Sequence, residues 1–198
     1  MINIAVLVSG GGTNLQALID SQNRGQNTSG KITLVVSSNE SAYALLRAKA
    51  ANIQTEVLLN EQFQSQDEYD SALIKLLSDY DIQLVVLAGF MTILSPKVIS
   101  AFRNRIINVH PSLIPSFCGK GCYGLKVHED ALKRGVKVSG ATVHFVNEIC
   151  DGGEIIAQKA IEVLSSDTPS TLQARIMQEC EWQILPEAVS KISEKLDN

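Results

Sequence analysis

The chain has 198 residues and a formal net charge of −4 at pH 7, and 45% of its residues are hydrophobic. This length suits one α/β domain with a sizeable core, and the acidic balance argues against binding to nucleic acid. The sequence contains neither the roughly 18-residue apolar run of a membrane span nor a secretory signal. We therefore expect a cytoplasmic protein that binds no membrane and keeps its four cysteines reduced.

The first half of the chain alternates between short apolar runs and helical patterns. The apolar runs over residues 2–8, 31–37 and 83–88 predict buried strands. Helices are predicted from Asn14 to about residues 23–25, over residues 41–51 and over residues 67–77. The third helix has an apolar stripe, formed by Tyr69, Leu73, Ile74 and Leu77. We expect its charged side to face water, and that side is formed by Asp67, Glu68, Asp70 and Lys75.

The second half of the chain mixes short helices with strands. The predicted elements are, in order, a helix starting at Ser95-Pro96, a strand ending at His110, a glycine-rich loop over 117–124, a helix over 127–133, strands over 138–146 and 154–163, and a last helix from about Pro169. A turn signal, Asp151-Gly152-Gly153, separates the two late strands, so they should be antiparallel. The last helix has one apolar face, formed by Leu172, Ile176, Cys180, Leu185, Ala188 and Ile192.

These elements predict the fold class. Strands that alternate with helices are typical of an α/β fold with an open, mostly parallel sheet and helices on both faces. The two late strands would add an antiparallel C-terminal pair. We find no internal repeat and no interdomain linker, so residues 1–198 are expected to form a single domain.

A glycine loop, residues 9–14 with the sequence SGGGTN, joins the first strand to the first helix. Backbone N–H groups and the helix dipole favour an anion at such a junction. The dinucleotide-binding pattern fails because Leu15 occupies the position of its third glycine, and no Walker lysine follows. The loop predicts a cradle for one phosphate group, with Thr13 and Asn14 as side-chain donors. The alternative is a tight turn that needs glycine only for its positive φ.

Asn108 and His110 share one face of a strand that Pro111 ends, because side chains alternate along a strand and proline has no N–H for the ladder. In open α/β sheets, ligands bind at this carboxyl end. If the turn at Asp151 folds over the sheet edge, its carboxylate would contact His110 and favour the charged imidazole. The three side chains would then polarise a carbonyl group. Otherwise, Asp151 is only part of a hairpin turn.

The remaining histidines and the cysteines carry weaker signals. We expect His128 to lie on the exposed side of its helix, and His144 to have a structural or supporting role. Cys118 and Cys122 lie between His110 and Cys150, which raises a metal site as an alternative. Their spacing within a flexible glycine loop, with no second compact ligand pair, argues against it, so no metal is predicted.

Several segments, in this order and at these separations, give nearly the whole chain a resemblance to the phosphoribosylglycinamide formyltransferase family. They are SGGGTNLQ at 9–16, LAGFM at 87–91, NVHPSLIP at 108–115, VHFV at 143–146 and DGG at 151–153. The resemblance implies a Rossmann-like fold and a transferase of purine biosynthesis. That enzyme would move the formyl group of 10-formyltetrahydrofolate to the amine of 5-phosphoribosylglycinamide (GAR), giving formyl-GAR and tetrahydrofolate.

The resemblance also implies roles for individual residues. The N-terminal half would bind GAR and the C-terminal half would bind folate and carry the catalytic groups. The GAR-binding residues would be Gly12, Thr13, Asn14 and Glu181. The folate pocket would be lined by Met91, Thr92, Ile93, Leu94 and Asn108. Asn108 and His110 would hold the formyl oxygen, and Asp151 would favour the protonated form of His110. The implied partners are these small molecules alone, and the chain would act as a monomer or homodimer.

The sequence departs from the family pattern at three places, and other functions remain open. Thr92 and Gln66 occupy positions where family members carry arginine, and the loop over 117–124 is longer than in some relatives. A formyltetrahydrofolate hydrolase would carry an extra N-terminal domain, and a methionyl-tRNA formyltransferase would carry a C-terminal nucleic-acid-binding domain. A non-catalytic phosphate-ligand-binding protein would need the glycine loop but neither His110 nor Asp151.

Overall fold

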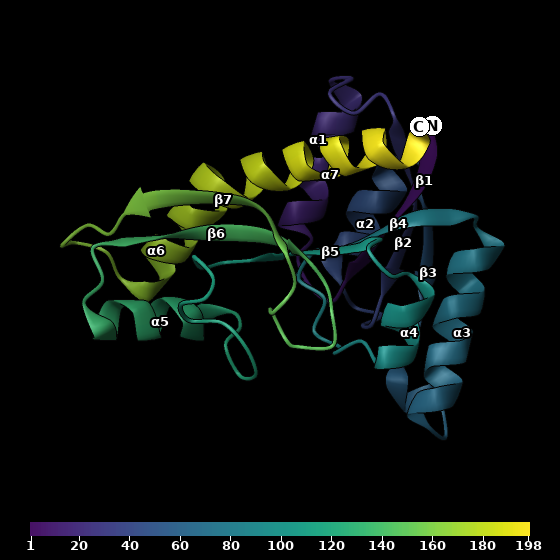
Figure 1. Ribbon diagram of the computed structural model, residues 1–198, viewed down its shortest axis with the longest axis horizontal. Coiled ribbons are helices and arrows are strands. Elements are labelled where there is room, and N and C mark those ends of the chain that lie inside the picture. Colours follow the sequence, from purple (N-terminus) through teal and green to yellow (C-terminus); the bar gives the residue numbers. More distant parts are fainter.

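The computed structural model describes all 198 residues and contains one seven-stranded sheet in the order β3-β2-β1-β4-β5-β6-β7 (Figure 1). Neighbouring strands from β3 to β5 are parallel, whereas β6 is antiparallel to both β5 and β7. The strands are β1 (Ile2–Val8), β2 (Gly30–Ser37), β3 (Gln54–Val57), β4 (Ile82–Leu87), β5 (Ile106–His110), β6 (Val138–Phe145) and β7 (Ile155–Glu162). The predicted fold class is confirmed.

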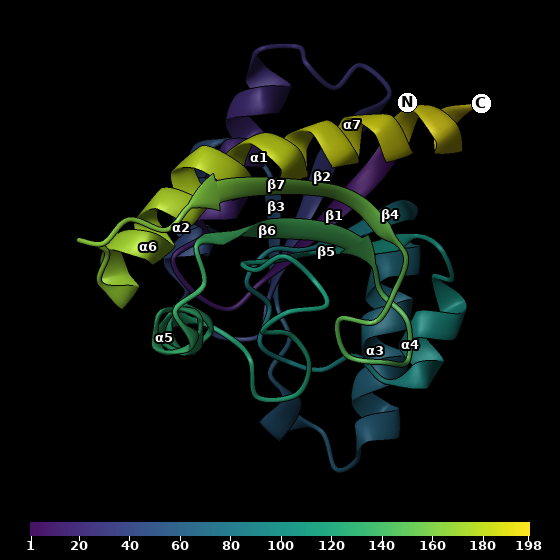
Figure 2. The ribbon, with the colours of Figure 1, turned by 60° about the vertical axis from the view of Figure 1, so that its left-hand side comes forward.

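Helices cover both faces of this sheet. They are α1 (Thr13–Asn23), α2 (Tyr43–Ala50), α3 (Gln66–Asp79), α4 (Pro96–Ala101), α5 (Leu125–Arg134), α6 (Pro169–Ile176) and α7 (Trp182–Asp197). Side chains of α1, α2, α6 and α7 form one apolar core on one face, and those of α3 and α4 form a second core on the other. Figure 2 shows α7 lying along the sheet on the same side as α1. None of the helices has both the length and the apolar character needed to cross a bilayer.

The strand order places two loops side by side at the carboxyl ends of neighbouring strands. Because β1 lies between β2 and β4, the chain leaves β1 at the switch point of the sheet, where open α/β folds bind ligands. The glycine loop follows β1, and the segment that begins at Gly89 follows β4. The two are joined by the N–H of Met91, which donates to Ser9 Oγ at 2.8 Å. The predicted phosphate loop and the predicted folate segment are therefore neighbours.

Two elements differ from the sequence prediction. Strand β3 was not predicted, because it has only four residues at the sheet edge and none of them is fully buried. The single C-terminal helix is interrupted by a π-helical turn, Met177–Glu181, between α6 and α7. The six apolar residues predicted on its face are all buried, so its orientation is as expected.

Two polar side chains that were expected to face water are buried. Asp70 is only 3% exposed and accepts hydrogen bonds from the Ser95 hydroxyl and from Gln66 Nε2. His128 is completely buried, and neither of its ring nitrogens has a hydrogen-bond partner. In both cases the packing of neighbouring elements overrides the apparent solvent face of the helix.

Candidate active site

The glycine loop enters α1 through a residue that must be glycine. Gly12 has a φ of 71°, in the left-handed region, and a Cβ at this position would lie 2.6 Å from the Cβ of Ala44. The N–H groups of Gly11 and Gly12 donate to no acceptor in the protein. Immediately after them, Thr13 Oγ1 donates to Met177 Sδ at 3.1 Å. The loop therefore presents free donors next to the first turn of a helix, as a phosphate cradle requires.

Glu181 approaches this loop from the π-helical turn. Asn14 Nδ2 donates to Glu181 Oε2 at 2.6 Å, so the structure brings the predicted GAR residues together. Burial raises the pKa of Glu181, and the hydrogen bond from Asn14 offsets part of that rise. Asn14 Oδ1 is buried and has no partner. π-helical turns are rare and often occur at functional sites, and this one directs Met177 and Glu181 at successive residues of α1.

Asn108 is held by a histidine across the sheet. Asn108 on β5 is paired in register with His144 on β6, and Asn108 Nδ2 lies 3.2 Å from His144 Nε2. His144 Nδ1 donates to the carbonyl oxygen of Phe145 at 2.7 Å. Since Nδ1 carries that hydrogen, Nε2 is free to accept one N–H of Asn108. His144 thus has the supporting role that was one of the two expectations for it.

Asp151 lies between two histidines. Its Oδ2 is 3.6 Å from His110 Nδ1, and its Oδ1 is 3.6 Å from His144 Nε2. The N–H of Gly119 also donates to Oδ2 at 2.8 Å. Burial alone would raise the pKa of Asp151, but the neighbouring His144, the hydrogen bond from the Gly119 N–H and the nearby His110 outweigh burial and lower it. The expectation that this turn folds over the sheet edge to reach His110 is confirmed.

The other ring nitrogen of His110 faces the glycine-rich loop. His110 Nε2 donates to the carbonyl oxygen of Phe117 at 2.9 Å, and the side chain is almost completely buried. This contact was not predicted, and no sequence signal could have revealed it, because the acceptor is a backbone atom in an irregular segment. The glycine-rich loop therefore contacts both His110, through the Phe117 carbonyl, and Asp151, through the Gly119 N–H.

A cavity of about 190 Å³ opens beside these residues. Its lining includes all five predicted folate-pocket residues, which are Met91, Thr92, Ile93, Leu94 and Asn108. The side chains of His144 and Asp151 also line it. His110 lies outside this lining, beneath the loop. Gln66, at a position where family members carry arginine, instead donates to the buried Asp70 at 2.8 Å. Cys118, Cys122 and Cys150 are free thiols, and no three His, Cys, Asp or Glu side chains are grouped to hold a metal ion.

The arrangement can donate hydrogen bonds to an oxygen atom of a bound molecule. Asn108 retains one N–H beyond its contact with His144, and His110 carries a hydrogen on Nε2. Asp151 remains ionised through neutral pH, so a negative charge lies beside both histidines. An amide donor at the wall of a largely apolar cavity, next to an imidazole and an ionised carboxylate, suits a reaction in which a carbonyl oxygen becomes negatively charged.

Comparison with known proteins places the chain in a family. Residues 2–189 match the family described as formyl transferase. The chain is 40% identical over 194 residues to phosphoribosylglycinamide formyltransferase from Haemophilus influenzae, covering 98% of this chain and 88% of that protein. It is also 42% identical over 190 residues, or 96% of its length, to the human trifunctional purine biosynthetic protein adenosine-3, of which it spans only 18%.

Solved structures agree with these sequence matches. The crystal structure of glycinamide ribonucleotide transformylase 1 from Symbiobacterium toebii superposes with a TM-score of 0.92 at 42% identity, covering 98% of this chain and 89% of that one. A phosphoribosylglycinamide formyltransferase from Brucella melitensis superposes with a TM-score of 0.89 at 36% identity, over 97% and 95% of the two chains. The chain described here belongs to the formyl transferase family.

Proposed function

We propose that this chain transfers the formyl group of 10-formyltetrahydrofolate to the amine of GAR, as a single formyltransferase domain. The observation that carries the proposal is the meeting of Asn108, His110 and Asp151 at the end of β5, beside the cavity lined by residues 91–94. The names of the relatives from Haemophilus influenzae and Brucella melitensis described above support the choice of substrate. The reaction needs two small molecules and no metal, and a monomer or homodimer in the cytoplasm would suffice for it.

In this reaction the neutral amine of GAR attacks the formyl carbon. The electrons of the C=O bond move onto the formyl oxygen, and their return breaks the bond to N10 of the folate, which leaves as tetrahydrofolate after taking up a proton. The ammonium proton is lost to solvent or to a nearby base. Asn108 and His110 donate hydrogen bonds to the oxygen while it is negatively charged. Removing one such donor typically slows the reaction ~10²- to 10³-fold.

The loop contact of His110 adds a condition to this mechanism. His110 Nε2 already donates to the Phe117 carbonyl, and Nδ1 faces Asp151. A formyl oxygen can accept from Nε2 only if the Phe117 carbonyl gives up its place. We therefore expect the segment around Phe117 to move when the formyl donor binds, while the Asp151 contact persists and keeps the imidazole oriented.

The two substrates would occupy adjacent sites. The apolar cavity beside residues 91–94 is the proposed site for the folate. Its mouth carries the exposed side chains of Met91 and Ile93, which would cover an aromatic ring system. The GAR phosphate would bind to Gly12, Thr13 and Asn14, and Glu181 would contact the rest of the nucleotide. The loops after β1 and β4 meet through Ser9 and Met91, which supports adjacent positions for the two substrates.

The experiment that tests this proposal compares folate turnover in the presence and absence of GAR. The purified protein is incubated with 10-formyltetrahydrofolate, and products are identified by mass spectrometry. We expect tetrahydrofolate and formyl-GAR to appear in equal amounts, and only when GAR is present. Formate released at the same rate without GAR would instead identify a hydrolase, and binding of both ligands without turnover would identify a non-catalytic binding protein.

A further inference from the structure

Arg47, on α2, lies behind the glycine loop and was assigned no role by the sequence. Its Nε donates to the carbonyl oxygen of Gly11 at 2.9 Å, and its Nη1 donates to Gln16 Oε1 at 3.1 Å. The guanidinium carbon also lies 5.0 Å from the centre of the Tyr43 ring, within range of a cation–π interaction. The guanidinium is therefore held by the loop, by α1 and by its own helix.

The hydrogen bonds from α2 decide which way the peptide groups of the loop face. In a trans peptide, the C=O of one residue and the N–H of the next point in opposite directions. The Gly10 carbonyl accepts from the N–H of Ala44 at 3.1 Å, and the Gly11 carbonyl accepts from Arg47. The N–H groups of Gly11 and Gly12 consequently point away from α2. Successive N–H groups turned to one side form an anion-binding concavity.

We infer that Arg47 is a positioning residue for the phosphate group of the substrate. It keeps the Gly11 carbonyl turned away, so that the Gly12 N–H faces the anion, and it places a fixed positive charge one peptide group behind the anion. The ligand class is a phosphate monoester dianion. The inference rests on the proposed function for the identity of the molecule that carries this phosphate.

The charge distribution around the loop supports this assignment. Arg47 is the one basic side chain that hydrogen-bonds to residues 9–14 or to the first turn of α1. A phosphate dianion held by backbone N–H groups alone would lack a compensating charge, and the chain as a whole is acidic. Nη2 of Arg47 has no acceptor in the protein, so the guanidinium keeps a free donor.

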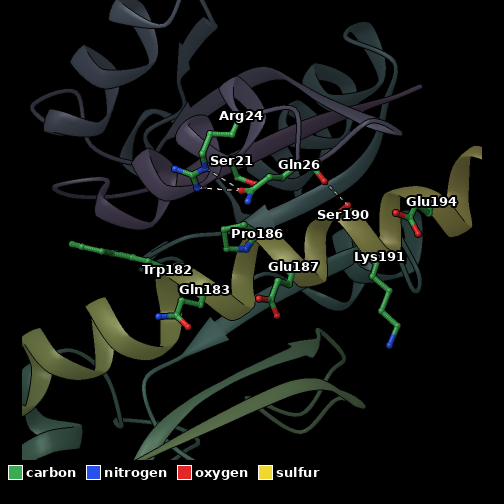
Figure 3. Close-up of a pocket in the computed structure, with 10 residues that line it drawn as sticks. All are labelled: Ser21, Arg24, Gln26, Trp182, Gln183, Pro186, Glu187, Ser190, Lys191 and Glu194. Atoms are coloured by element: carbon green, nitrogen blue, oxygen red, sulfur yellow. Dashed lines mark hydrogen bonds between the residues drawn. The ribbon is translucent and has the colours of Figure 1, made fainter.

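Arg24 provides a matched control on the same side of the molecule. It lies at the end of α1 and lines, with Trp182, both a groove of about 430 Å³ along α7 and the adjoining hollow that Arg47 also lines. Its guanidinium donates only to Gln26 Oε1, at 3.2 and 3.1 Å, as Figure 3 shows. Removing Arg24 therefore takes away a nearby positive charge without changing any contact of the glycine loop.

The test compares three variants, Arg47→Met, Arg47→Lys and Arg24→Met, with the wild type. Methionine keeps most of the apolar stem that lies beside Gly12. Lysine keeps the charge but lacks the guanidinium that bonds to the Gly11 carbonyl and to Gln16 at once. Each protein is assayed with GAR and with the dephosphorylated glycinamide ribonucleoside. Calorimetry measures the binding of inorganic phosphate separately.

We expect Arg47→Met to raise the KM for GAR roughly tenfold or more with little change in kcat, since a hydrogen bond from a charged group is lost. The kcat/KM for the ribonucleoside should stay unchanged, the lysine variant should recover part of the loss, and Arg24→Met should behave as wild type. Equal losses on both substrates, or an unchanged KM in Arg47→Met, would overturn the assignment.

The phosphate titration separates this inference from the proposed function. If the protein transfers no formyl group to GAR, weaker phosphate binding by Arg47→Met than by wild type and Arg24→Met would still support the role of Arg47. Equal phosphate affinity in all three proteins, or no measurable binding to the wild type, would overturn it whatever the outcome of the activity assay.

Discussion

Asp151 Oδ2 lies 3.6 Å from His110 Nδ1, so a residue of the turn between β6 and β7 meets the imidazole at the end of β5. The turn can approach this closely because Gly153 lies against the carbonyl oxygen of Phe145, where any Cβ would clash. The Gly119 N–H and His144 hold the carboxylate in place. The relationship gives the buried His110 imidazole an ionised neighbour that fixes its orientation.

The first prediction concerns Asp151→Asn. The pKa of Asp151 lies below its usual value, so the carboxylate is ionised throughout the neutral range and into mildly acidic solution. Asparagine removes this charge from the buried site beside His110. We expect kcat to fall at neutral pH, and we expect the variant to lack the loss of activity that protonation of Asp151 causes in wild type at acidic pH. A variant with the kcat of wild type and an unchanged acidic limb would contradict this role.

The second prediction concerns Glu181→Gln. Burial raises the pKa of Glu181 above 4.5, so its ionised form opposes folding. The destabilisation is absent at low pH, where the carboxyl is protonated in both states, and it develops as the pH rises from 4.5 through the folded-state pKa. Glutamine removes this effect, so unfolding by urea at pH 7 should require more denaturant than for wild type.

The same variant should weaken GAR binding. If the carboxylate of Glu181 contacts GAR, Glu181→Gln should raise the KM for GAR roughly tenfold, since a charged hydrogen bond becomes a neutral one. Glu179→Gln is a suitable control, because Glu179 pairs with Arg175 and contacts no residue of the glycine loop. Greater stability with an unchanged KM would leave Glu181 a structural residue only.

The third prediction concerns His128, whose burial and proximity to His110 lower its pKa to about 4. The folded state keeps this imidazole neutral, while the unfolded chain binds a proton below about pH 6.5. Stability should therefore fall as the pH drops from about 6.5 to 4, by roughly 3 kcal/mol in all. His128→Leu should remove that part of the loss. Urea unfolding at pH 7.5 and pH 4.5 measures it, and an equal loss in both proteins would contradict the explanation.

The sequence was informative where one residue type decides the local structure. Pro111 ends β5 and leaves His110 at the carboxyl edge, and the glycines after Val8 form the strand-to-helix junction, so both halves of the site could be located before their contacts were known. The antiparallel C-terminal pair was predicted from the turn signal at residues 151–153, and the α/β fold from the alternation of strands and helices. The roles of the individual site residues remain predictions that the variants above address.

Features that depend on packing could not be predicted. Asp70 and His128 belong to helices whose polar sides looked solvated, but both are buried, Asp70 against Ser95 at the start of α4 and His128 near His110. The π-helical turn adds one residue to a helix whose apolar periodicity survives the insertion, so the pattern does not reveal it. The contacts of Phe117 and Gly119 use backbone atoms, and the role inferred for Arg47 depends on the orientation of two peptide groups.

The most direct test of the central claim follows the formyl carbon itself in a single turnover. The enzyme, in excess, is mixed with GAR and 10-formyltetrahydrofolate labelled with ¹³C in the formyl group, and the reaction is quenched and analysed by NMR. For wild type we predict that the label moves to the amine nitrogen of GAR. For His110→Ala we predict the same product, formed ~10²- to 10³-fold more slowly with unchanged GAR binding. Label that appears as formate, or a variant as fast as wild type, would contradict the account.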